Sequence, residues 1–195
     1  MHTICIVETG KKAPVEIYQI KIALMGSKPA VWRRILISGD TTLARLHDIL
    51  QVVMGWTNAH LHRFIVKGQT YAIPDRGDIG PRKPKDERKF TLRDIAQEGS
   101  RLVYEYDFGD NWQHGLDVEA ILPPEEGMQY PACLEGAGAC PPEDVGGISG
   151  YEHFLEAMGD PKHPEHQNCR DWIGGTFDPQ KFNLTQVNKI FRNIA

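Results

Sequence analysis

Pairs of short segments with alternating apolar and polar residues, joined by tight turns, recur along this chain of 195 residues. Alternation with a period of two is typical of a strand that buries one face and exposes the other. Because only a few turn residues separate the members of each pair, the two strands are expected to lie antiparallel. Three hairpins are therefore predicted, from residues 15–22 with 31–37, 60–66 with 69–73, and 102–108 with 112–121.

An amphipathic helix is predicted directly after the first hairpin. Asp40, Thr41 and Thr42 offer an N-cap, and Gly55 ends the helical pattern. Weaker patterns predict a helical turn at 91–96, a helix around 151–158 and a C-terminal helix that begins at Asp178-Pro179. The first helix is expected to pack on the first hairpin through Leu43, Leu46, Ile49, Leu50, Val53 and Met54.

Hairpins interspersed with helices, without a regular alternation of strand and helix, indicate the α+β class. We expect an antiparallel or mixed sheet built from hairpins and covered by about three helices. The length is that of a single domain over residues 1–195. Long loops are predicted at 74–90, which is charged and solvated, and at 123–147, and a shorter polar loop at 160–171.

Charge is distributed unevenly along the chain. Residues 105–160 contain thirteen Asp or Glu and no Lys or Arg, whereas residues 1–104 contain seventeen Lys or Arg and ten Asp or Glu. Phosphate contacts need Lys or Arg, so the acidic stretch does not suit a nucleic-acid backbone. It suits a bound cation, a basic partner or the basic half of the same fold, and the residues leave these alternatives open.

Four cysteines stand at positions 5, 133, 140 and 169. The first residues lack the basic and apolar regions of a signal peptide, and no apolar run approaches the roughly 20 residues that span a bilayer. We therefore expect a cytoplasmic protein with reduced thiols and no membrane partner. Each thiol is then available for packing, redox chemistry or metal binding.

Motifs in a fixed order run through most of the chain. They are Pro29-Ala30-Val31-Trp32-Arg33-Arg34, Gly55-Trp56-Thr57-Asn58, His60-Leu61-His62-Arg63-Phe64, Tyr106-Asp107-Phe108-Gly109-Asp110-Asn111-Trp112, Cys140-Pro141-Pro142-Glu143-Asp144-Val145-Gly146-Gly147 and Phe177-Asp178-Pro179. In these motifs the chain resembles the plasmid pRiA4b ORF-3-like family of bacterial and archaeal proteins, over residues 15–193. The resemblance implies a fold group and no particular reaction. Some members are labelled resolvase-like through an association with mobile elements.

The turn of the third hairpin carries the first candidate site. Asp107 and Asp110 flank the turn, and His114 follows on the return strand. Carboxylates and an imidazole at one strand end can ligate a metal or share a proton. The alternative is turn chemistry, in which an Asp side chain accepts from backbone amides.

Cys133, Cys140, Glu143 and Asp144 form a second candidate site in the 123–147 loop. Thiolates are good zinc ligands, although structural zinc sites usually space a pair by two to four residues. A metal site here would therefore need further ligands from Asp110, His114 or the distant Cys169, and the predicted metal set comprises Asp110, His114, Cys133 and Cys140. The alternative is that Cys140 packs beneath the loop. We predict that residues 133–147 fold back onto residues 107–114.

Three further groups are weaker candidates. His163, His166 and Cys169 have ligand types at three-residue spacing, but they lie in the predicted polar loop. His60 and His62 share one face of a strand and can supply half of a metal site or a surface pair. Arg33 and Arg34, next to Trp32, resemble a small anion-binding cluster.

We predict a non-enzymatic binding or interaction module with an acidic site rimmed by aromatic residues, for a small ligand or a protein. A metal-dependent hydrolase, acting on nucleic acid or another substrate, and a DNA accessory factor are the alternatives. A divalent metal is the cofactor that these residues suggest. The aromatic walls would be Trp56, Tyr106, Trp112 and Tyr151, and the polar groups Asp107, Asp110, His114, Glu143 and Asp144.

Overall fold

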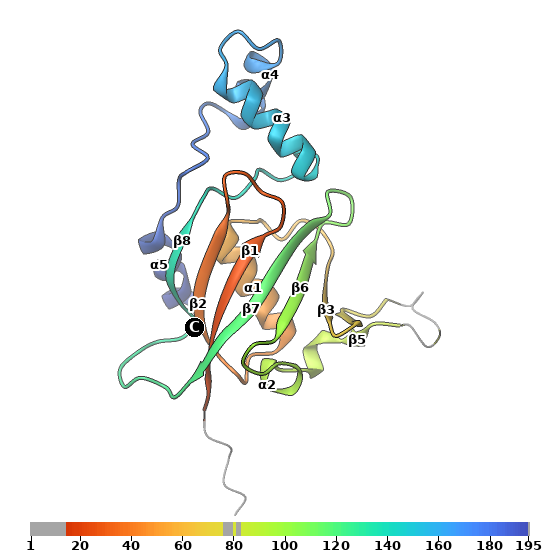
Figure 1. Cartoon of the computed structure of the whole chain (residues 1–195), viewed down its shortest axis with the longest axis vertical. Helices are drawn as coiled ribbons and strands as arrows, with labels where there is room; N and C mark the ends of the chain where they lie inside the picture. Colours follow the sequence, from red (N-terminus) through yellow and green to blue (C-terminus); the bar gives the residue numbers. More distant parts are fainter. Residues whose placement is uncertain (1–14, 76–79, 81–82, 195) are drawn as a thin grey trace, which may run out of the picture.

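An eight-stranded mixed sheet forms the body of the protein in the computed structural model, which describes residues 15–75, 80 and 83–194 (Figure 1). Cys5 and part of the predicted 74–90 loop lie outside these residues. The strand order is β5-β4-β3-β6-β7-β1-β2-β8, and only β4 and β5 pair in parallel. The strands are β1 (Ile17–Leu24), β2 (Trp32–Ser38), β3 (His62–Val66), β4 (Gln69–Ala72), β5 (Lys85–Asp86), β6 (Arg101–Tyr106), β7 (Trp112–Leu122) and β8 (Ala132–Ala137).

Five α-helices and one 3-10 helix, η1 (Glu87–Lys89), accompany the sheet in the described part of the chain. The predicted α+β class is confirmed, with more helices than the expected three. None of the described helices has the length and apolar character needed to cross a membrane. The α-helices are α1 (Leu43–Met54), α2 (Leu92–Ile95), α3 (Gly147–Gly159), α4 (His166–Ile173) and α5 (Leu184–Ile194).

The three predicted hairpins are present with antiparallel register. Ile20 pairs with Ile35, Phe64 with Tyr71, and Tyr104 with His114. The inward-facing members of these pairs are buried because one face of the sheet packs on α1, as the alternation predicts.

Helix α1 follows the predicted boundaries. Thr42 caps it by accepting a hydrogen bond from the backbone N–H of Arg45, and Gly55 ends it in the left-handed conformation. The predicted apolar stripe is buried in the core. The helix therefore fixes the segment that follows Gly55, which carries part of the site.

The two neighbouring arginines of β2 point to opposite faces of the sheet. Arg34 lies on the outer face and forms ion pairs with Glu119 and Glu135. Arg33 is buried, and its guanidinium donates to the carbonyls of Trp32, Val53, Ala137 and Gly138 at 2.7–2.9 Å. The predicted anion-binding cluster is therefore wrong, because Arg33 is occupied in joining α1 to the chain beyond β8.

Four segments differ from the sequence-based prediction. The 123–147 loop contains β8, which pairs with β2, and the predicted polar loop at 160–171 contains the start of α4. Helix α5 begins at Leu184 rather than at Pro179, because Asp178 forms a turn with Gln180 and Lys181. Glu87, predicted to be solvated, is buried.

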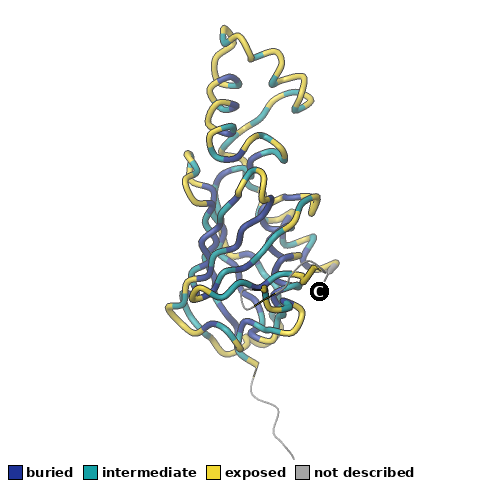
Figure 2. Tube along the Cα trace, turned by 90° about the vertical axis from the view of Figure 1, so that its right-hand side faces the viewer, coloured by how far each residue is buried: buried dark blue, intermediate teal, exposed yellow. Residues whose placement is uncertain are grey.

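Helices α3 and α4 form an arm that projects beyond the end of the sheet (Figure 1). Figure 2 shows that most buried segments lie in the body, whereas much of the arm is exposed. The chain enters the arm through residues 138–146, here called the entry segment. This segment passes the β6–β7 turn and the loop after α1, so three distant parts of the sequence meet at one end of the sheet.

Candidate metal centre

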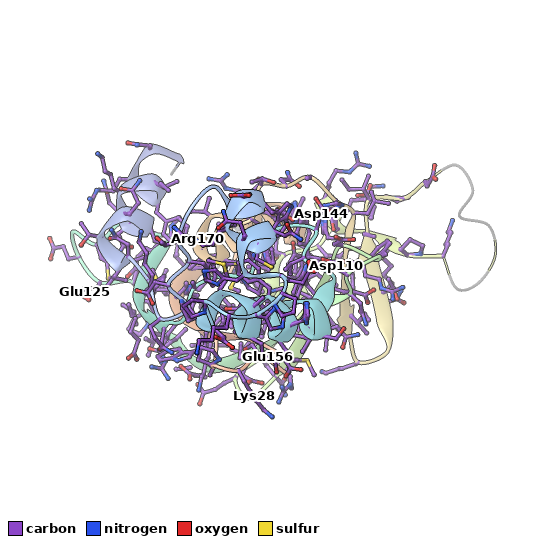
Figure 3. The ribbon with its side chains drawn as sticks, turned by 90° about the horizontal axis from the view of Figure 1, so that it is seen from above. Lys28, Asp110, Glu125, Asp144, Glu156 and Arg170 are labelled. Carbon is purple, nitrogen blue, oxygen red and sulfur yellow. The ribbon has the colours of Figure 1, made fainter. Side chains whose placement is uncertain are left out.

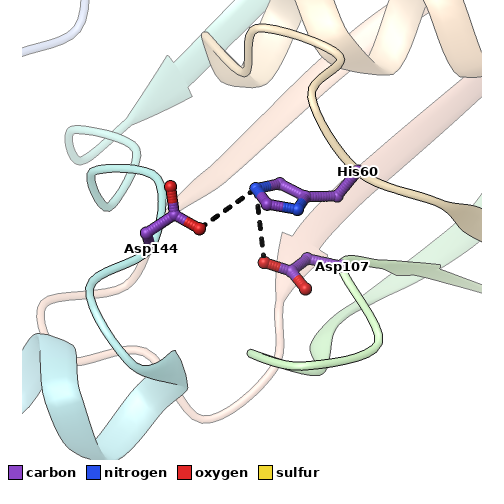
Figure 4. A group of neighbouring side chains, drawn as sticks. All are labelled: His60, Asp107 and Asp144. Atoms are coloured by element: carbon purple, nitrogen blue, oxygen red, sulfur yellow. Dashed lines mark ion pairs between the residues drawn. The ribbon is translucent and has the colours of Figure 1, made fainter.

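His60 lies in the loop between α1 and β3. Its Nε2 atom is buried and has no hydrogen-bond partner among the described residues. The ring packs edge-on against Tyr106, at 5.8 Å between ring centroids. Nε2 therefore points at the neighbouring carboxylates of the β6–β7 turn and the entry segment (Figure 4).

Asp107 starts the β6–β7 turn with a left-handed backbone, at φ 55°. Its Oδ1 accepts from the backbone N–H groups of Gly109 and Asp110, which is the predicted turn chemistry. Its Oδ2 takes no part in these turn hydrogen bonds and lies 3.6 Å from Nε2 of His60. The side chain is only 9% exposed, so a carboxylate is held almost out of solvent in a sparsely populated backbone conformation.

Glu143 and Asp144 approach from the entry segment. Oε1 of Glu143 accepts from the backbone and hydroxyl of Thr57 and from the hydroxyl of Tyr106, at 2.8–3.1 Å. Its Oε2 is buried without a hydrogen-bond partner, 3.8 Å from Nε2 of His60. Asp144 also has a left-handed backbone, and its Oδ1 lies 3.2 Å from the same nitrogen, although its side chain is 71% exposed.

The Tyr106 hydroxyl orients the Glu143 carboxylate. Burial, with a further contribution from Glu143, raises the pKa of Tyr106 to about 12, so the hydroxyl keeps its proton and donates it. The same hydroxyl accepts from the backbone N–H of Ala59 at 3.0 Å. One oxygen of Glu143 is thereby fixed by the protein, and the other faces His60.

The atoms of His60, Asp107 and Asp144 that can bind a metal all lie within 4.8 Å of one another. Oε2 of Glu143 is a fourth such atom beside Nε2 of His60. An imidazole with carboxylates is a donor set for Mn²⁺, Fe²⁺ or Zn²⁺. The cluster can therefore hold a divalent cation.

Asp110 lies beside this cluster, and its label is close to that of Asp144 when the molecule is seen from above (Figure 3). Its Oδ2 accepts from the backbone N–H of Gly146 at 3.1 Å. Gly147 passes so close that a Cβ would lie 2.5 Å from the carbonyl oxygen of Asp110. Residues 144–147 thus fold back onto the hairpin, and Asp110 holds them there instead of facing a ligand.

The predicted metal set is not brought together. Cys133 lies on β8, where its backbone N–H donates to Asn188 of α5. Burial raises the pKa of Cys133 to about 11 and that of Cys140 well above its usual value, so both remain thiols. Among the described residues, Asp110, His114, Cys133 and Cys140 form no group that can share an ion.

The four aromatic side chains that were predicted to form the rim of an open site are buried instead. Trp56, Tyr106, Trp112 and Tyr151 are buried, and Trp56 packs on both Tyr106 and Trp112, at 5.3 and 5.5 Å between ring centroids. His114 is also buried, with the edge of its ring against Trp56. Tyr106 supports a carboxylate of the cluster directly, through its hydrogen bond to Glu143, and the burial of these aromatic side chains means that they do not line an open pocket.

His60 is central to the site, although the sequence analysis gave it only as a weaker candidate. The His60-Leu61-His62 pattern indicated one shared face, but the two rings take different partners, and His62 pairs with Glu87. The weaker His163, His166 and Cys169 group does not form a site among the described residues, since His166 contacts the carbonyl of Ala157 instead.

The fold and the site together define a class of α+β protein in which an acidic, histidine-containing cluster lies at one end of an antiparallel-rich sheet. The chain belongs to the family of plasmid pRiA4b ORF-3-like proteins, whose family profile matches residues 16–186. The resemblance of the sequence motifs to this family is thereby confirmed.

Two relatives cover nearly the whole chain. The chain is 38% identical over 184 residues to the uncharacterised protein y4hQ of Sinorhizobium fredii, and the match covers 92% of each protein. It is also similar to the crystal structure of MM3350, a protein of unknown function from Methanosarcina mazei, with a TM-score of 0.79 and 35% identity over 88% of this chain and 97% of that chain. Neither name states an activity, so function has to be argued from the site.

Proposed function

We propose that the protein is a binding module whose site takes one divalent cation between His60, Asp107, Glu143 and Asp144. The separation of the ligand atoms carries this proposal. Two ligands each about 2.1 Å from one ion lie about 3.0 Å apart at a right angle and about 3.4 Å apart at a tetrahedral angle. Nε2 of His60 lies 3.2, 3.6 and 3.8 Å from its three carboxylate oxygens, close to those separations.

The unpartnered atoms support the same proposal. Buried polar atoms normally have a hydrogen-bond partner, and Nε2 of His60 and Oε2 of Glu143 have no hydrogen-bond partner in the described part of the chain. A cation between them would give both atoms a partner. The hydrogen bonds that Tyr106 and Thr57 donate to the other oxygen of Glu143 are the kind of support that orients a metal ligand.

The charge of the site favours cation binding over cleavage of nucleic acid. Three carboxylates exceed the charge of one divalent ion, so the occupied site would still carry negative charge. Residues 105–160 contain no Lys or Arg to attract a phosphate. A binding role therefore accounts for these residues better than a nuclease role.

Titration of EDTA-treated protein with Mn²⁺ and Zn²⁺ by calorimetry tests the proposal. One ion should bind per chain, and His60→Gln and Asp107→Asn should each weaken binding by about 100-fold or more. His153→Gln, which changes an exposed histidine on α3, is the matched control and should bind like the wild type.

Failure of the wild type to bind either ion stoichiometrically would contradict the proposal, as would unchanged affinity in both site variants.

A further inference from the structure

Two carboxylates of the proposed metal centre can each offer only one oxygen to an ion, because the other oxygen is already in use. Oδ1 of Asp107 accepts from two backbone N–H groups of the β6–β7 turn. Oε1 of Glu143 accepts from the backbone and hydroxyl of Thr57 and from the hydroxyl of Tyr106. Both carboxylates are thereby oriented to bind an ion through the second oxygen alone, as monodentate ligands.

The side chains of the centre do not fill the coordination shell of every ion that suits them. The protein supplies Nε2 of His60 and one oxygen each from Asp107, Glu143 and Asp144. Among the described residues, no other His, Cys, Asp or Glu joins this group. Mn²⁺ with oxygen ligands prefers an octahedral shell, which these protein atoms leave incomplete.

Asp144 marks the side of the centre that faces solvent. Its side chain is 71% exposed, against 9% for Asp107 and 19% for Glu143. The carboxylate of Asp144 approaches from the entry segment, opposite the loop that carries His60 (Figure 4). The positions that the protein leaves free therefore lie beside Asp144, where water or a solute can reach them.

The charge of the occupied centre determines which ligand suits these positions. A metal-bound imidazole is neutral, so three carboxylates around one divalent ion leave a negative charge. No described Lys or Arg side chain forms an ion pair with Asp107, Glu143 or Asp144. An anion such as phosphate would add to a negative charge that is only partly screened by solvent, whereas water, a hydroxyl or a carbonyl oxygen adds no charge.

Building on the proposed function, we propose that a Mn²⁺ ion in this centre keeps a position beside Asp144 for an exchangeable neutral oxygen ligand. That ligand is water, or the hydroxyl or carbonyl group of a small molecule. Structural metal sites are closed by protein ligands, whereas sites that act on a substrate keep an open position. The centre is thus of the open kind, and a neutral molecule is recognised through the ion.

The water molecules bound to the ion can be counted. Calorimetry first establishes that the protein is loaded with Mn²⁺, and the relaxation of water protons is then measured over a range of magnetic fields. The ion should carry about two exchangeable waters, or about one where Asp144 binds through both oxygens. Inorganic phosphate in excess over the protein should leave this number unchanged.

Asp144→Gly tests where the open positions lie. Glycine readily adopts the left-handed backbone of this residue, at φ 58°, so the variant removes a ligand without straining the entry segment. The number of bound waters should rise by about one as water replaces the carboxylate. Asp160→Gly changes an exposed aspartate at the end of α3 and is the matched control, which should bind the same number of waters as the wild type.

Mn²⁺ that binds in a ratio of one ion per chain but carries no exchangeable water would overturn this inference and leave the proposed function standing. Displacement of the waters by phosphate would overturn the preference for a neutral ligand. An unchanged number of waters in Asp144→Gly would refute the position beside Asp144. Failure of Mn²⁺ to bind is seen separately, in the calorimetry, and would refute the proposed function and this inference together.

Discussion

Two clusters of buried polar groups at the same end of the sheet are built in opposite ways. Around Tyr104 the hydrogen bonds form a closed ring. The Tyr104 hydroxyl contacts His47 and Gln51, and Asn58 contacts His47 through its side chain and Gln51 through its backbone N–H, at 2.8 and 2.7 Å. In a second group, the buried side chains Trp56, Trp112, His114 and Tyr151, each member has at least one buried polar atom without a hydrogen-bond partner among the described residues.

The two groups show the difference between polar side chains that stabilise the fold and polar side chains whose hydrogen-bonding atoms are left for a ligand or for water. A closed network rigidifies a core because every member is satisfied by the protein itself. Buried polar atoms without a hydrogen-bond partner in the protein need water or an ion, because otherwise they lower the stability of the folded state. The network around Tyr104 should therefore respond to substitution as a structural element, and the other cluster should respond to pH and to ions.

Acidification should produce the largest effect, and it acts on the unpartnered cluster. Burial lowers the pKa of His114 from 6.5 to about 4. Between these values the unfolded chain binds a proton that the folded protein does not, so stability is present above pH 6.5 and is lost as the pH falls toward 4. At about 1.4 kcal/mol per pH unit, the loss is on the order of 3 kcal/mol.

Urea denaturation from pH 7 to 4 measures this loss, and comparison with His114→Phe removes the contribution of other groups. The unfolding free energy of the wild type should fall relative to that of His114→Phe as the pH falls, by on the order of 3 kcal/mol between pH 6.5 and 4. A constant difference between the two proteins would show that His114 does not titrate in this way.

Tyr104→Phe should give the next largest effect, because it opens the closed ring. His47 and Gln51 would lose the hydroxyl that they share, and unfolding free energy should fall by about 1–3 kcal/mol. Tyr71→Phe is the control, since Tyr71 is also buried but its hydroxyl makes no hydrogen bond with the described residues, and it should change stability by less than about 0.5 kcal/mol. Equal losses in the two variants would mean that the ring is not a structural unit.

Asp144→Asn should have the smallest effect on the metal-free protein. Its side chain is largely exposed, so unfolding free energy in EDTA should change by at most about 0.5 kcal/mol, toward greater stability because one of three neighbouring negative charges is removed. In excess Mn²⁺ or Zn²⁺ the order should reverse, with the wild type stabilised more than the variant. A large loss of stability in EDTA would place Asp144 among the structural residues.

The fold was predictable wherever periodicity was strong. The hairpins and α1 follow from alternation and from the apolar stripe that ends at Gly55. By contrast, β8 has the sequence Ala132-Cys133-Leu134-Glu135-Gly136-Ala137 without alternation, and it is a strand because it pairs with β2. Helix α4 has only eight residues, none of them buried, and its apolar residues Cys169, Trp172 and Ile173 cover a single turn, which is too short a pattern to predict a helix.

The site was predictable in part, through the concentration of acidic residues between 105 and 160. That pattern indicated Asp107, Glu143 and Asp144, because carboxylates that meet need a compensating group. It gave no means to assign His60 to them and His62 to Glu87, since those partners depend on how the loop after α1 and η1 pack in three dimensions. Trp56, Trp112 and Tyr151 were wrongly placed at the rim of a pocket, because residue type alone does not show whether an aromatic side chain lines a pocket or lies buried below the surface.

The bonds that Arg33 donates to Ala137 and Gly138 have a consequence for ligand affinity. They fix the start of the entry segment, and Asp110 fixes its end at Gly146, so Glu143 and Asp144 lie in a stretch of chain that is immobilised on both sides. Ordering a residue costs about 1–2 kcal/mol of conformational entropy. Here that entropy is lost when the chain folds, so a ligand that meets these carboxylates finds them already in place and keeps more of its interaction energy as affinity.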